Sequence, residues 1–390
     1  MASLRFLTAG ESHGPGLTVV LEGLPAGLRV PAEDIDLELA RRQMGYGRGG
    51  RMAIERDRVE IRAGIRHGRT LGGPIALWIE NRDFANWSES MSPAPRAGAD
   101  LRPLHRPRPG HADLAGAGKL ETDDARPVLE RASARETAAR VAAGALAKRL
   151  LGEVGCEVRS HTLTLGAIRG PDAGAVGWPE ILAIPADSPF RCVSSEIEQL
   201  MRAEVDRARE AGDTLGGSFE VVAHTPPPGL GHFSQWDLRL DGRVGQAMLS
   251  IPAAKSVAIG AGERAPDLPG SQVHDAIRRG PSGVERPTNR AGGIEGGMSN
   301  GEEVRVVVGM KPLSTLRQPL ESVDLITGNA APAGFERSDV TVVPAAGVVG
   351  EAMLALVLAG ALLEKFSGDS LGETLRNVRG HGEAIGWRGR

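Results

Sequence analysis

The apolar run AMLALVLAGALL at 352–363 places the strongest limit on how this chain can fold. A helix that spans a membrane needs about 20 such residues, and this run has only twelve uncharged residues. We therefore interpret it as the centre of a buried helix, which we expect over 346–366. A helix that is apolar on every side has to lie inside the protein.

The remaining composition is typical of a soluble globular protein. Of 390 residues, 41% are hydrophobic and 24% are charged, and the net charge is −3, which gives no overall attraction to nucleic acid or membrane. Cys156 and Cys192 lie outside any C-x-x-C pattern, and the histidines lack metal-ligand spacing, so neither a disulfide framework nor a metal site is expected. The N-terminus does not resemble a signal peptide, and we expect a cytoplasmic protein.

The order of the expected strands and helices favours an α+β fold. Apolar patterning predicts strands at 3–9, 17–22, 72–81, 216–224 and 303–310, and helices at 31–44, 123–151 and 195–211. The last of these helices is expected to be capped by Ser195, with Glu198 completing a capping box. Because strands and helices do not alternate regularly, a doubly wound sheet is disfavoured. No linker is visible, so we interpret residues 1–390 as one domain, with about the last 15 residues as a flexible tail.

Two glycine motifs imitate known functional motifs but lack the structure that those motifs need. GESHG at 10–14 matches G-x-S-x-G, yet a nucleophile elbow requires a helix after the turn, and a strand-like segment follows here. GYGRGG at 45–50 matches G-x-G-x-x-G, but it follows a helix and precedes a strand, the reverse of a dinucleotide fingerprint. We therefore expect neither a serine hydrolase with Ser12 as nucleophile nor a Rossmann domain.

Basic residues and histidines recur in four clusters that suit anionic ligands. Guanidinium groups bind carboxylate and phosphate in bidentate fashion, and buried arginines are costly without anions to pair with. Each cluster alone is also consistent with a solvated loop or helix end, but together they predict a ligand with several negative charges and histidines as proton donors. The clusters are GESHG at 10–14, ARRQMGYGRGGR at 40–51, RPLHRPRPGHADL at 102–114, and a dispersed group formed by 130–136, 292–301 and 310–317.

Seven motifs, in this order, resemble chorismate synthases, and the similarity runs from Ala9 to beyond Phe366. They are GESHG, RRQMGYGRGGRM, RPRPGHADLAG, ERASARETAARVAAG, GGIEGGMSNG, MKPLST and ERSDVTVVPAAGVVGEAM. The resemblance implies a homotetramer of β-α-β sandwich subunits that catalyses the last step of the shikimate pathway, towards aromatic amino acids. This carbon–oxygen lyase reaction eliminates phosphate from 5-enolpyruvylshikimate 3-phosphate in an anti-1,4 sense, which gives chorismate. It requires reduced FMN but involves no net redox change.

The same resemblance implies roles for individual residues. His13 would protonate the departing phosphate, His111 would stabilise or protonate reduced flavin, and Asp339 would assist removal of the C6 proton through flavin N5. A histidine beside such anions is expected to have a raised pKa, which suits a general acid. Anions of the substrate would be held by Arg42, Arg48 and Arg108, of which the first two also match positions associated with NADPH. FMN contacts are expected from Arg131, Ala132, Ser133, Pro252, Ala253, Gly297, Lys311, Pro312, Leu313, Ser314, Thr315 and Arg337.

One short segment departs from the pattern of the family. Many members have Arg-His-Asp where this chain has Arg337-Ser338-Asp339. No flavin-reductase domain is visible, so we expect an external flavin reductase, with NADPH as an indirect reductant.

A non-catalytic anion- or RNA-binding protein is disfavoured by the 3% aromatic content, since bases stack on aromatic rings. A flavin oxidoreductase with net hydride transfer would differ by consuming reductant. Neither nucleic acid nor membrane is expected as a partner.

Overall fold

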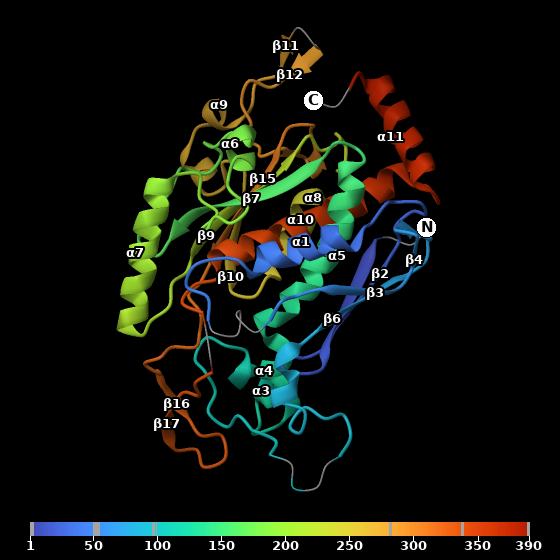
Figure 1. Cartoon of the computed structure of the whole chain (residues 1–390). Helices are drawn as coiled ribbons and strands as arrows, with labels where there is room; N and C mark the ends of the chain where they lie inside the picture. Colours follow the sequence, from blue (N-terminus) through green and yellow to red (C-terminus); the bar gives the residue numbers. More distant parts are fainter. Residues whose placement is uncertain are drawn as a thin grey trace.

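Two antiparallel sheets lie on either side of a layer of helices in the computed structural model of this chain (Figure 1). The structure describes residues 4–49, 55–95, 98, 100–280, 283–336 and 339–387. The first sheet has the order β1-β2-β6-β3, with strands at Arg5–Ala9, Gly16–Glu22, Ile75–Glu80 and Val59–Ala63. The second has the order β10-β15-β9-β7-β8, with strands at Ala254–Ile259, Val304–Met310, Gly217–His224, Glu157–Leu165 and Ile168–Arg169.

Two long helices fill the space between the sheets. Helix α5, Thr137–Gly152, packs on β1, β2 and β6 of the first sheet, and α10, Val343–Phe366, packs on β7 and β9 of the second. The two helices pack on each other, with α1, Ala32–Gln43, beside both and α8, Leu240–Leu249, against α10. This arrangement confirms the predicted α+β class and the β-α-β sandwich.

Short elements complete the described chain. The hairpins are β4–β5 at Ile65–Arg66 and Arg69–Thr70, β11–β12 at Arg278–Gly280 and Gly283–Glu285, β13–β14 at Ile294–Glu295 and Met298–Ser299, and β16–β17 at Glu321–Val323 and Ala330–Pro332. The other α-helices are α3 Asp113–Leu120, α4 Arg126–Ala132, α6 Trp178–Leu182, α7 Ser195–Ala211, α9 Gly270–Val273 and α11 Leu371–Ile385. Single 3₁₀ turns are η1 Arg82–Asn86, η2 Ala134–Glu136, η3 Trp236–Leu238 and η4 Gly262–Asp267. Helices α3 and α4 and the β16–β17 hairpin lie at one end of the sandwich, at the bottom of Figure 1.

The apolar run lies in the middle of the sandwich, as the sequence predicts. By length and composition α10 could span a membrane, but 89% of its most apolar window is buried inside the protein. The approach of α5 to α10 is so close that a Cβ at Gly144 would lie 2.3 Å from the Cβ of Ala352. Glycine is therefore required where the two central helices meet.

Three local predictions differ from the structure. The helix expected over 123–151 is interrupted, because Ser133 has extended backbone angles and its side chain caps η2 by accepting from the Arg135 amide. The cap of α7 is Ser194, one residue before the predicted Ser195. The flexible tail is wrong for residues up to Ile385: they belong to the amphipathic helix α11, which is capped by Ser370 and buries Val378.

A buried carboxylate joins the central helices to the second sheet. The fully buried Glu351 on α10 accepts hydrogen bonds from cations on three other segments and from a hydroxyl on β7. Burial alone would raise the pKa of Glu351, but the surrounding cations lower it well below its usual range. The donors are Arg41 Nη1 at 2.7 Å, Lys148 Nζ at 2.5 Å, Arg191 Nη2 at 3.0 Å and Ser160 Oγ at 2.7 Å. We call these five residues the Glu351 cluster.

We predict that Glu351→Ala lowers the free energy of unfolding by about 3–5 kcal/mol, because it removes the carboxylate that pairs with buried Arg191 and leaves Arg41 and Lys148 to share Glu38. Glu364→Ala is a matched control on the same helix. Its ion pair with Arg243 is at the surface, so its loss should cost less than about 1 kcal/mol. Chemical denaturation of both variants measures the difference, and equal effects would contradict the prediction.

Candidate active site

The glycine-rich loop between β1 and β2 holds His13 in a fixed backbone conformation. Asn81 Nδ2 donates to the carbonyl oxygens of Glu11 at 3.0 Å and Gly14 at 2.8 Å, and Arg135 Nε donates to Asn81 Oδ1 at 2.8 Å. Gly10 has φ +109°, and a Cβ there would lie 2.3 Å from the carbonyl oxygen of Gly16. A strand, β2, follows this loop, so the nucleophile-elbow geometry is excluded.

The His13 side chain is enclosed by α4 and by an aromatic ring. Its Nδ1 lies 2.8 Å from Glu130 Oε1, and its backbone N–H donates to Glu130 Oε2 at 2.8 Å. The imidazole stacks on Trp87 with 4.0 Å between ring centroids. Burial would raise the pKa of Glu130, but its contacts with His13 and Arg126 outweigh burial and lower it. An ionised carboxylate therefore faces the histidine.

His111 belongs to a second group, on the loop that precedes α3. Its Nδ1 is in close contact with Asp113 Oδ1 and lies 3.0 Å from Arg108 Nη2. Arg108 Nε donates to Asp113 Oδ2 at 2.8 Å, and its Nη1 donates to Thr315 Oγ1 at 2.9 Å. Burial would raise the pKa of Asp113, but hydrogen bonds from His111 and Arg108 lower it. The predicted substrate ligand Arg108 is thus buried and bound to its own chain.

Asp339 and Arg48 lie together in a cavity of about 440 Å³, which we call the site cavity. Arg48 Nη1 lies 3.2 Å from Asp339 Oδ2, and the Gly49 amide donates to Asp339 Oδ1 at 2.5 Å. Thr315 also lines the site cavity, so the His111 group reaches it through Arg108. The remaining lining residues are Gly47, Arg209, Gly212, Asp213, Thr214, Arg317, Phe335 and Val340.

The MKPLST segment lies beside two other predicted FMN contacts. The Lys311 amide donates to the Ala253 carbonyl at 3.0 Å, which places Pro252–Ala253 next to it. Lys311 Nζ donates to the Gly110 carbonyl and to Ser314 Oγ at 3.0 Å. Burial and the nearby Lys255 lower the pKa of Lys311. No carboxylate pairs with this ammonium among the residues that the structure describes.

Arg42 faces the interior of the protein. Its Nη2 lies 2.8 Å from Asp57 Oδ2, and Arg135 Nη1 lies 2.5 Å from the other oxygen of that carboxylate. Burial lowers the pKa of Arg42 to about 10. Its Nε is a buried nitrogen that has no hydrogen-bond partner within the described ranges. Asp57 thus supplies an anion that the sequence analysis expected from a ligand.

Sequence reasoning missed several residues that shape this region. Glu130 is the first residue of the ERASARETAARVAAG motif, but the sequence predicts no role for it. Asp57 is a single acid in a basic stretch. Trp87 could have been noticed in the sequence, because tryptophan is rare in this chain, which has only five. Asn81 could not, because its importance depends on contacts between segments that are distant in the sequence.

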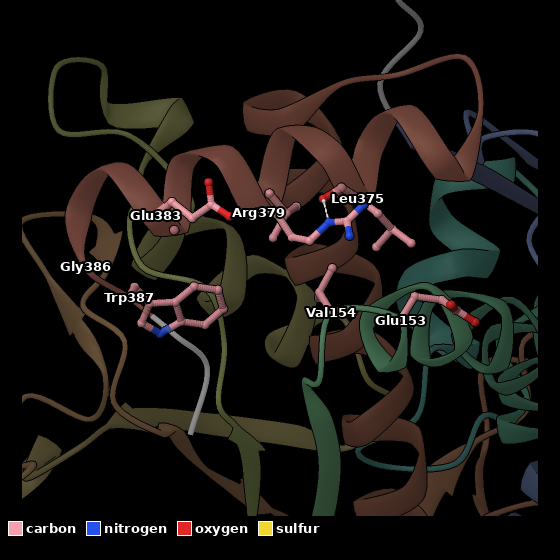
Figure 2. A pocket seen from close by; sticks show the side chains of 9 residues that line it. Glu153, Val154, Leu375, Arg379, Glu383, Gly386 and Trp387 are labelled. Atoms are coloured by element: carbon pink, nitrogen blue, oxygen red, sulfur yellow. Dashed lines mark hydrogen bonds between the residues drawn. The ribbon is translucent and has the colours of Figure 1, made fainter. Parts of the chain in front are cut away.

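Some predicted residues are not joined to these groups. Gly297 accepts from the amides of His232 and Leu240 instead, and Arg51, Arg337 and Ser338 lie outside the described residues. A larger cavity of about 1000 Å³ lies between α11 and the end of α5, lined by Glu153, Val154, Leu375, Val378, Arg379, Gly382, Glu383, Gly386 and Trp387 (Figure 2). None of these lining residues is a predicted site residue. The smaller site cavity, which Arg48, Thr315 and Asp339 line, is therefore the better candidate for the active site.

Asp57 gives a pH-dependent prediction. Burial would raise its pKa, but Arg42 and Arg135 lower it, so its stabilising effect is fully present above the ordinary value of 3.8 and is lost as the pH falls through the lowered value. Asp57→Asn should therefore unfold at lower urea than wild type at pH 7, with a gap that begins to shrink only below pH 3.8. The exposed Asp100→Asn is the control, and a gap that already closes between pH 7 and 5 would contradict this account.

Comparisons with known proteins agree on one family. The chorismate synthase family profile matches residues 4–363. Chorismate synthase of Thermobifida fusca (strain YX) is 52% identical over 389 residues, covering 98% of this chain and 99% of the relative. That of Moorella thermoacetica (strain ATCC 39073 / JCM 9320) is 56% identical over 370 residues, covering 94% and 95%. A chorismate synthase crystal structure has a TM-score of 0.80 at 40% identity and covers 99% of both chains. The chain therefore belongs to the chorismate synthase family, and it is a carbon–oxygen lyase that eliminates phosphate from 5-enolpyruvylshikimate 3-phosphate to give chorismate in the shikimate pathway.

Proposed function

We propose that the elimination takes place at the end of the sandwich where the His13 loop, the His111 loop and the site cavity meet, with reduced FMN as cofactor. One observation carries this proposal: Asp339, Arg48 and Thr315 line one cavity although they are far apart in the sequence. His111 is one contact beyond, through Arg108. His13 is joined through Glu130 and Arg126 to Glu336, which lies three residues before Asp339.

The residues around Lys311 fit a flavin phosphate. Lys311 and Arg131 both hydrogen-bond to backbone carbonyls, and neither is paired with a carboxylate in the described part of the chain. A partly desolvated ammonium without a counter-charge gains most from an anionic ligand. We therefore propose that Lys311, Ser314 and Thr315, with Pro312 and Leu313 between them, hold FMN together with Arg131, Ala132, Ser133, Pro252 and Ala253. Gly297 and Arg337 stay in this proposal on the family resemblance alone. When bound, reduced FMN supplies and recovers electron density during the elimination.

The histidines are proposed to move or hold protons at the two ends of the reaction. His13 would donate a proton to the phosphate oxygen as the C3–O bond breaks. His111, held by Asp113 and Arg108, would place an imidazole beside the flavin. The stacking of His13 on Trp87 removes water from one face of its ring, which strengthens its interaction with an anion.

Asp339 is proposed to hold the proton that leaves C6 of the substrate. In this structure its carboxylate lies 3.2 Å from Arg48 Nη1 and accepts a hydrogen bond from the Gly49 amide, and both of these residues line the site cavity with it. Arg48 and Arg108 would hold substrate anions. Arg42, which is buried and paired with Asp57, would act on the substrate anions only indirectly, through that carboxylate. NADPH binding near Arg42 and Arg48 is part of the same proposal.

We also propose a cytoplasmic homotetramer that receives reduced FMN from an external flavin reductase. The family resemblance supports these points. Phe233 and Trp236 are 70% and 82% exposed, and exposed aromatic residues of this kind are commonly covered in an assembly.

An anaerobic assay tests the proposed function. With reduced FMN and 5-enolpyruvylshikimate 3-phosphate, we expect chorismate and phosphate in equal amounts over many turnovers, while the flavin spectrum returns to the reduced form. The reason is that the elimination has no net redox change. Oxidation of one flavin per product would instead favour an oxidoreductase.

We predict that His13→Ala and Asp339→Asn still bind reduced FMN but lose turnover by about 10²–10⁴-fold, the usual contribution of a general acid or base. Phosphate release measures turnover, and flavin fluorescence measures binding. His105→Ala is the control: His105 is a partly exposed histidine in the segment before His111, and its Nδ1 contacts the Asp123 carbonyl. Turnover near that of wild type in His13→Ala would remove His13 from the mechanism.

A further inference from the structure

We propose that Glu130 is the positioning residue of His13: it fixes the ring orientation and holds the proton on Nδ1, so that Nε2 faces the departing phosphate. This inference rests on the proposed role of His13. Nothing in the sequence motifs assigns a task to Glu130, and its carboxylate does not line the site cavity.

One carboxylate binds His13 twice. Glu130 Oε2 accepts from the His13 backbone N–H, and Oε1 lies at the same 2.8 Å distance from Nδ1 of the ring. In addition, the Ser12 amide donates to the Glu130 carbonyl oxygen at 2.9 Å. Backbone and side chain of the histidine are thus tied to a single residue of α4, which leaves the imidazole little freedom to rotate.

The surroundings restrict the orientation of the ring on a second side. Trp87 covers one face of the imidazole at 4.0 Å. The guanidinium of Arg102 lies 4.4 Å from the centre of the Trp87 ring, and that of Arg126 lies 5.4 Å from it. Glu130, Arg126 and Arg102 are thus charged groups next to the His13–Trp87 stack, and Glu130 is in hydrogen-bond contact with the imidazole.

The Glu130 carboxylate is ionised because its contacts with His13, and to a lesser extent with Arg126, lower its pKa. Arg126 Nη1 lies 3.5 Å from Glu130 Oε1, and Arg126 Nη2 lies 3.0 Å from Glu336 Oε1. The Glu130 side chain is only 1% exposed, so a charge there needs such compensation. The lowered pKa of Glu130 agrees with this arrangement. An ionised carboxylate has no proton to donate, so it can only accept a hydrogen bond, and the donor is Nδ1–H.

The contact decides which ring nitrogen delivers the proton. With Nδ1–H donated to Glu130, the proton that leaves the imidazolium comes from Nε2. The C3–O bond of the substrate breaks with its electron pair on the phosphate oxygen, and that oxygen takes the Nε2 proton. The product is neutral His13 that still carries Nδ1–H. A carboxylate behind a catalytic histidine sets the tautomer and stabilises the imidazolium in the same way in other enzymes.

Glu130→Gln tests the proposal, because it keeps the size of the side chain and removes the charge, and its amide N–H can donate to Nδ1 where the carboxylate can only accept. We expect kcat to fall by about 10²–10⁴-fold, with KM and FMN binding changed by less than a few-fold. The alkaline limb of the kcat–pH profile should move to lower pH, because the variant removes the negative charge beside the imidazole. Glu130→Asp keeps the charge and should restore the position of the limb.

Glu303→Gln is the matched control. Glu303 Oε1 lies 2.8 Å from Nδ1 of His224, the same distance as in the Glu130 pair, but on strands outside the site. This variant should leave kcat and the pH profile unchanged. If Glu130→Gln lowers thermal stability or FMN binding without moving the alkaline limb, Glu130 is merely structural and the proposal is wrong. An unchanged kcat overturns it as well.

A double variant separates this proposal from the proposed role of His13. If Glu130 acts through His13, Glu130→Gln has no further effect on kcat in the His13→Ala background. An additive loss overturns the inference while leaving the role of His13 intact. If His13→Ala alone keeps wild-type turnover, the role of His13 fails, and nitrogen NMR of His13 then decides the rest. Loss of the Nδ1–H tautomer in Glu130→Gln supports the positioning, and an unchanged tautomer overturns it.

Discussion

The carboxylate of Glu351 is the interaction on which the arrangement of the central layer depends. A charge in the middle of an apolar helix is costly unless cations and hydroxyl groups surround it. The contacts with Glu351 hold three segments in place: α1 through Arg41, α5 through Lys148, and the loop that contains Arg191. Arg41 is followed by Arg42 and, beyond the end of α1, by Arg48. The buried cluster therefore sets where the chain leaves the core and enters the site.

The same requirement explains how the arginines are divided between structure and ligand. Buried guanidinium groups need anions, and the sequence analysis assigned those anions to substrate and cofactor. In the structure, Asp57 already pairs with Arg42 and Arg135, and Asp113 pairs with Arg108. Side chains without such a partner are the better candidates for ligand contacts. Arginine in a motif thus indicates an electrostatic requirement but does not say which molecule meets it.

Much of the fold followed from patterns that are local in the sequence. The apolar run predicted the central helix, and short apolar segments predicted β2, β6, β9 and β15, because burial on one or two faces leaves a direct trace in residue order. The break at Ser133 was missed because a serine that caps a new turn looks the same as a serine inside a helix. The C-terminal helix α11 was missed because its apolar face is narrow and depends on the core that it covers.

The sequence motifs propose candidate residues for the site but not their contacts. Motifs point to His13, His111 and Asp339 as candidates, and the partners of two of them come from distant parts of the chain: Glu130 for His13, and Arg48 for Asp339. Loops at one end of a two-sheet sandwich converge from many positions in the sequence, so no local pattern records which carboxylate meets which cation. His111 is the exception, since Asp113 lies two residues away. The geometry of a proton donor is set by its partners, and in this fold those partners come from α4 for His13 and from the loop after α1 for Asp339.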